Sequence, residues 1–115
     1  MATIKSFTDI SQGRKLAEIL PLESADMRFC FSHTLDGRTI GHYPMIGREP
    51  SLGTIPCWSL SALLGVLPDY TLQTNTDGTV FVVCDSKKPM ILDAYSNPVD
   101  ACVAMIIHLH ELNLL

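Results

Sequence analysis

The chain has 115 residues, the length of one domain, and we expect residues 1–115 to fold as a single unit. Apolar residues make up 47% and charged residues only 17%, so we expect part of the surface to be shared with a partner. The net charge of −4 and the scattering of the eight Lys and Arg residues argue against direct binding to nucleic acid.

The first predicted element is a helix that Thr8 or Asp9 caps and that runs to about Leu20. Pro21 ends it. Its inner stripe consists of Ile10, Gly13, Leu16, Ala17 and Leu20.

Residues 27–32, "MRFCFS", alternate in the manner of a strand. From His33 to Thr54 the chain is irregular, although "LDGRT" could form a hairpin turn. We interpret the Gly- and Pro-rich part, residues 37–53, as a functional surface or as a region with short strands that the sequence does not place.

A second helix is predicted from Pro56 to Leu67, followed by Pro68. Only Ser59, Ser61 and Gly65 interrupt its apolar character, so we expect it to be largely buried, with Trp58 as a core residue.

A β-hairpin follows, in which "YTLQT" and "TVFVVCD" flank the turn "NTDG", with Gly78 supplying a positive φ. A third strand is predicted from Met90 to Tyr95.

Ser96 or Asn97 then caps a last helix that has Pro98 in its first turn and Asp100 near its positive end. One face of it should carry Val99, Cys102, Val103, Ile106, Leu109, His110 and Asn113. The fold class is therefore α+β, with a small antiparallel sheet and helices packed on one face.

Cys57 followed by Trp58 at a helix start is the arrangement of the nucleophile in papain-like cysteine proteases. A helix N-terminus would lower the pKa of the thiol, but a nucleophile also needs a histidine base. The histidines that follow it, His108 and His110, both lie on the last helix, and no "QxGxC" precedes Cys57. We therefore favour a packed thiol, and keep Cys57 with His110 as the candidates for a catalytic alternative.

The sequence "HLHE" does not predict a metal site. On a helix, residues two apart point about 200° away from each other, so His108 and His110 cannot share an ion. We expect His110 at the edge of the core and His108 at the surface.

No partner is predicted for the three aspartates Asp69, Asp85 and Asp93. We interpret Asp69 and Asp85 as residues at element ends and Asp93 as solvent-facing. No cofactor is predicted, because phosphate-loop and nucleophile-elbow patterns are missing.

We expect a cytoplasmic protein that has no membrane segment. The first ten residues, "MATIKSFTDI", lack the apolar core of a signal peptide, and no apolar run approaches about 18 residues. The cysteines form no CxxC pair, which favours reduced, metal-free thiols at Cys30, Cys57, Cys84 and Cys102.

Two segments, "PCWSLSALLGVLP" and "DAYSNPVDACVAMIIHLHELNLL", resemble a family of small uncharacterised proteins from gut bacteria and their prophages. The matching residues are Trp58–Leu64, Pro68 and Asp100–Cys102, in the C-terminal half of the chain. The resemblance implies a mobile genetic element in a bacterial cytoplasm, and it carries no activity.

We therefore expect a non-enzymatic interaction protein that self-associates, as a homodimer, and binds an unidentified protein partner. The low charge, the apolar second helix and the tail "LNLL" lead to this expectation. The alternative is a small cysteine-dependent hydrolase or transferase that uses Cys57.

Overall fold

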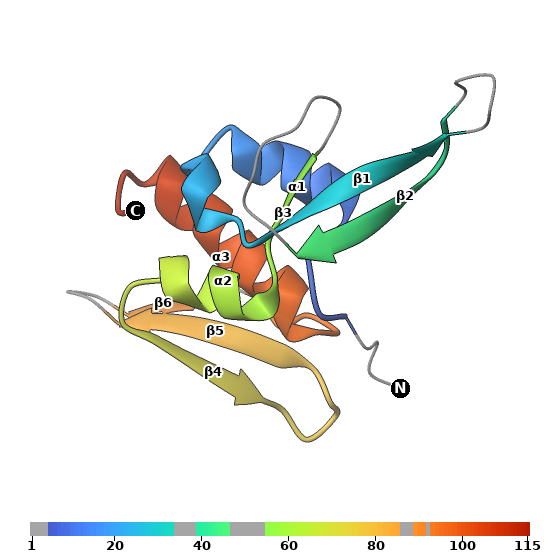
Figure 1. The fold of residues 1–115 in the computed structure, drawn as a ribbon. Coiled ribbons are helices and arrows are strands. Elements are labelled where there is room, and N and C mark those ends of the chain that lie inside the picture. Colours follow the sequence, from blue (N-terminus) through green and yellow to red (C-terminus); the bar gives the residue numbers. More distant parts are fainter. Residues whose placement is uncertain (1–4, 34–38, 47–54, 86–88, 92) are drawn as a thin grey trace.

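The computed structural model describes residues 5–33, 39–46, 55–85, 89–91 and 93–115, with side chains at 5–29, 55–84 and 93–115. The described residues form three α-helices, one 3₁₀ turn and six strands (Figure 1). In chain order these elements are α1 (Ile10–Ala17), η1 (Leu22–Ser24), β1 (Met27–His33), β2 (Thr39–Ile46), β3 (Ile55–Cys57), α2 (Leu60–Val66), β4 (Tyr70–Thr74), β5 (Val80–Asp85), β6 (Pro89–Ile91) and α3 (Pro98–Glu111).

The strands form two antiparallel sheets, in the orders β2–β1–β3 and β4–β5–β6. We call them the first and the second sheet. In the first sheet, β3 pairs only with the start of β1, from Met27 to Phe29. The β1–β2 ribbon extends beyond that point and reaches away from the helices (Figure 1).

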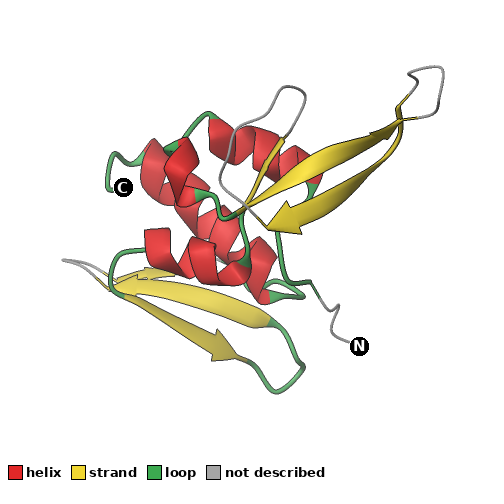
Figure 2. Cartoon of the chain, in the orientation of Figure 1, coloured by secondary structure: helices red, strands yellow, loops and turns green. Residues whose placement is uncertain are grey.

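The α+β class is confirmed. The helices gather at the centre of the molecule, with the second sheet on one side and the β1–β2 ribbon reaching away on another (Figure 2). The strands divide between two sheets because β3 joins β1, whereas β6 joins β5.

Helix α3 is the main contributor to the core. Asn97 caps it, accepting a hydrogen bond from the backbone N–H of Asp100 at 2.9 Å, and Pro98 occupies its first turn, as predicted. It packs against β5, α2 and α1. Its buried residues are Val99, Ala101, Cys102, Val103, Met105, Ile106 and Leu109. Trp58 is 0% exposed and belongs to the same cluster, so its prediction as a core residue is confirmed.

Helix α1 lies directly on β3. A Cβ atom on the buried Gly13 would stand 2.3 Å from the carbonyl oxygen of Pro56, so only glycine fits at this spacing. Asp9 begins the helix with a capping box, since its side chain accepts from the N–H of Gln12 and its own N–H donates to the Gln12 side chain. The helix ends at Ala17, three residues earlier than predicted.

The predicted second helix, Pro56–Leu67, is wrong at its start. Residues 55–57 form β3, and α2 begins after Ser59, which caps it. Asp26 fixes this start, because its carboxylate accepts from the Ser59 N–H at 2.9 Å and from the Ser59 hydroxyl at 2.5 Å. The helix is also less covered than expected. Leu63 is its buried residue, and its other apolar side chains are half-buried.

The hairpin prediction is confirmed: β4 and β5 pair from Tyr70 opposite Cys84 to Thr74 opposite Val80, and Gly78 has φ +89°. The strand at 27–32 is also confirmed. Residues 39–46, predicted as irregular, form β2, so the expectation that this region contains strand structure is confirmed, and its role as a functional surface stays a prediction. The proposed "LDGRT" turn lies mostly outside the described residues.

No helix in the described part of the chain is both long and apolar enough to cross a bilayer.

Candidate functional site

The segment before α1 runs beside the start of α2 and encloses Cys57. The N–H of Thr8 donates to the carbonyl of Trp58 at 2.9 Å, and the Trp58 N–H donates back to the Thr8 hydroxyl at 3.0 Å. Thr8 and Cys57 are both 0% exposed. Trp58 is fixed further by its indole N–H, which donates to the Ser24 hydroxyl at 3.0 Å. The Cys57–Trp58 pair is therefore part of the packed interior.

The environment of the Cys57 thiol disfavours a thiolate. Burial raises its pKa, and this effect outweighs the hydrogen bonds with Thr8, which act in the opposite direction. The thiol donates to the Thr8 carbonyl at 3.5 Å and accepts from the Thr8 hydroxyl at 3.7 Å. Cys57 lies on β3 and not at the start of a helix, so no helix N-terminus lowers the pKa of its thiol. The expectation of a packed thiol agrees with this geometry.

The prediction that His110 lies at the edge of the core is wrong, since His110 is exposed and His108 is half-buried. Burial along α3 stops after Leu109, since every residue from His110 to Leu115 is exposed. The prediction relied on helical spacing alone, which puts His110 on the same face as the buried residues of this helix.

Two of the three predicted aspartates, Asp69 and Asp93, have described side chains, and both are exposed. Asp93 is exposed, as predicted, but lies beyond β6. Asp69 is exposed between α2 and β4, with φ +36°. Asp85 ends β5, and its side chain lies outside the description. In the described part of the chain, no three His, Cys, Asp or Glu side chains group closely enough to hold a metal ion.

A polar network that the sequence did not predict joins the beginnings of α1 and α3. The Lys5 ammonium lies 2.8 Å from an Asp100 carboxylate oxygen and 3.3 Å from Asp9. Gln12 and Asn97 each donate to Asp100 at 2.8 Å. Burial alone would raise the pKa of Asp100, but these hydrogen bonds and the charge of Lys5 outweigh it and lower that pKa.

The same network raises the pKa of Lys5. Burial is the largest single effect and lowers that pKa, but the hydrogen bonds and charges of Asp100 and Asp9 together outweigh it. Both charges are therefore paired within the protein and act as structural connections. The capping box of Asp9 and the acidic first turn of α3 are visible in the sequence. Their connection through Lys5 depends on the fold, so no local signal reveals it.

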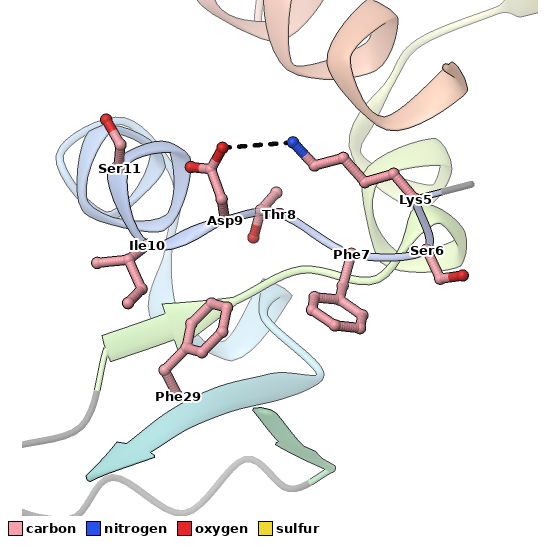
Figure 3. A pocket seen from close by; sticks show the side chains of 8 residues that line it. All are labelled: Lys5, Ser6, Phe7, Thr8, Asp9, Ile10, Ser11 and Phe29. Atoms are coloured by element: carbon pink, nitrogen blue, oxygen red, sulfur yellow. Dashed lines mark hydrogen bonds and ion pairs between the residues drawn. The ribbon is translucent and has the colours of Figure 1, made fainter. Parts of the chain in front are cut away.

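An apolar hollow lies on the other side of the segment before α1. Its volume is about 620 Å³, and its apolar walls come from Phe7, Ile10 and Phe29. The rings of Phe7 and Phe29 meet edge to face with centroids 6.1 Å apart. Figure 3 shows these three side chains on one side of the segment and the Lys5–Asp9 pair on the other. The hollow thus presents hydrocarbon, and the nearby charges are already paired.

Comparisons with protein-family models, curated proteins and solved structures find no significant match for this chain.

Proposed function

We propose that the protein is a non-enzymatic protein-interaction module that associates with itself. Its surface carries the proposal: five large apolar side chains in the described part of the chain are 41–56% exposed, and a protein partner can cover such surface.

The character of the surface supports a protein partner. Only 17% of residues are charged, and the Lys and Arg residues are scattered rather than gathered into the patch that nucleic acid requires. Several large apolar side chains lie in solvent, namely Leu22, Tyr70, Leu112, Leu114 and Leu115. As part of the same proposal, the module acts in a bacterial cytoplasm and is encoded by a mobile genetic element. The free thiols of Cys57, Cys84 and Cys102 fit a reducing compartment.

The competing hypothesis, a hydrolase or transferase that uses Cys57, has no comparable support. The raised pKa and complete burial of its thiol are the opposite of what a nucleophile requires.

Light scattering on a sizing column tests self-association. The proposal expects a mass near twice 12.7 kDa in the micromolar range, decreasing on dilution. A mass of 12.7 kDa throughout that range would exclude it.

A further inference from the structure

Proline residues mark three of the four sheet edges. Pro44 lies on β2 and Pro56 on β3, both paired with β1, and Pro89 lies on β6, paired with β5. In an antiparallel ladder, residue pairs that exchange two hydrogen bonds alternate with pairs whose polar groups face outward. Proline has no N–H and fits only the outward-facing positions. Each of these edges therefore lacks one outward donor, which is a known obstacle to the pairing of a further strand.

The fourth edge belongs to β4, and the ladder shows which of its groups face outward. Val80 exchanges two hydrogen bonds of 2.7 Å with Tyr95, so its N–H and carbonyl face away from β4. Thr74, which is opposite Val80, therefore directs its own N–H and carbonyl outward. The same alternation applies to Leu72 and Tyr70, whereas Thr71 and Gln73 bond to β5.

Within the described residues, no device protects this edge. The strand "YTLQT" holds no proline and no charge, and its only strand partner among the described residues is β5. All of its residues are exposed except Leu72, which is half-buried against the core, and Tyr70 is 41% exposed. In Figure 1, β4 lies at the border of the second sheet, on the far side of β5 from β6. Its outward donors and acceptors are therefore open to a further strand.

We propose that β4 pairs in antiparallel fashion with β4 of a second copy, about a two-fold axis between the two Leu72 residues. The pairing rests on the self-association proposed above and assigns a surface to it. Two sheets of three strands would join into one continuous sheet, and β-strand addition of this kind uses main-chain hydrogen bonds for affinity.

The strand itself favours a second copy as the occupant. Its outward-facing residues are the first, third and fifth of five, so a two-fold axis at Leu72 places outward donors opposite outward acceptors along the whole strand. Tyr70 then lies opposite Thr74 of the second copy, an aromatic and β-branched pair. Thr71 lies opposite Gln73, so no like charges meet.

A matched pair of double variants tests this register. Thr71 and Gln73 are exposed, and substitution there leaves the core unchanged. In T71K/Q73K, each lysine of one copy is opposite a lysine of the other. In T71K/Q73E, each lysine is opposite a glutamate. We expect T71K/Q73K to have a dimer dissociation constant roughly tenfold or more above that of T71K/Q73E. Circular dichroism of diluted samples should show the same fold for both.

Hydrogen exchange gives a second measurement on the unmodified protein. Exchange at the Leu72 N–H should slow as the concentration rises through the dimer transition, because that group is bonded only in the dimer. The Thr71 N–H, bonded to β5 in the monomer, should not change.

The outcomes separate the two proposals. A monomeric native protein would overturn both and leave the edge to an extended segment of another protein. A dimeric native protein whose two variants dimerise equally well, with unchanged exchange at Leu72, would retain self-association and overturn the role of β4. If T71K/Q73K and T71K/Q73E are both weakened relative to the native dimer, and to the same extent, the two-fold register is wrong.

Discussion

Replacing Gly13 by alanine should destabilise the protein, although alanine is the better helix former. The new Cβ would stand 2.3 Å from the Pro56 carbonyl oxygen and 3.4 Å from the Cγ2 atom of Ile55. The first distance is far inside van der Waals contact, and the opposing atom belongs to the backbone of β3. Helix α1 must therefore move away from the first sheet.

Two opposing terms set the magnitude. Alanine in a helix interior gains about 1 kcal/mol over glycine. Forcing an extra methyl group into a packed site costs about 1–3 kcal/mol, and a backbone obstacle places Gly13 at or above the upper end. We expect a net loss of about 2 kcal/mol or more.

Gly65 provides the control. It is also helical, in α2, but it is exposed and an added Cβ would meet nothing within 4 Å. Gly65→Ala should therefore stabilise the protein by about 1 kcal/mol. Urea unfolding followed by the fluorescence of Trp58, the only tryptophan, measures both variants through the shift in midpoint at constant slope. If Gly13→Ala were as stable as Gly65→Ala, the close contact between α1 and β3 would be wrong.

Four further outcomes are expected. Trp58→Ala should cost about 3–5 kcal/mol, seen by calorimetry, and an unchanged melting temperature would contradict its burial. Gly78→Val should cost about 1–2 kcal/mol or more, because a β-branched residue resists a φ of +89°, and undiminished stability would refute the turn assignment. The folded-state pKa of Asp100 lies below its ordinary value of 3.8, so its stabilisation is complete above that value and is lost as the pH falls through the folded-state pKa. Asp100→Asn should therefore show a shallower loss of stability below about pH 4, and an identical acid profile would exclude the network as its cause. A thiol-reactive probe should label Cys57 only on unfolding, and fast labelling of that residue in the native protein at neutral pH would restore the catalytic hypothesis.

Elements that depend on local chemistry were predictable from the sequence. Asn97 and Pro98 mark the start of α3, and "NTDG" marks the β4–β5 turn, because capping and positive φ are properties of a few adjacent residues. The burial of Trp58 follows from its apolar neighbours. The α+β class required no more than these signals.

Elements that depend on distant partners were not predictable. Residues 55–57 look like the first turn of a helix because proline is common there, yet they pair with β1, about 28 residues earlier in the chain. Similarly, β2 contains glycine and proline and is a strand because β1 lies beside it. His110 was misplaced for a related reason, since helical periodicity does not show where packing along a helix ends. The Lys5–Asp100 connection spans almost the whole chain.

The central place of α3 determines when the protein can fold during synthesis. The ribosome makes this helix after every other described element, yet it supplies seven of the fifteen buried residues of the main core cluster, more than any other element. Until it emerges, the apolar faces of α2 and β5 have no cover, and Lys5 has no Asp100 to bind. Folding is therefore delayed until α3 is complete. Before that, the incomplete nascent chain exposes hydrophobic surface and the open edge of β4, and both features promote aggregation. A nascent chain of this kind is a natural client for chaperones that hold apolar segments apart.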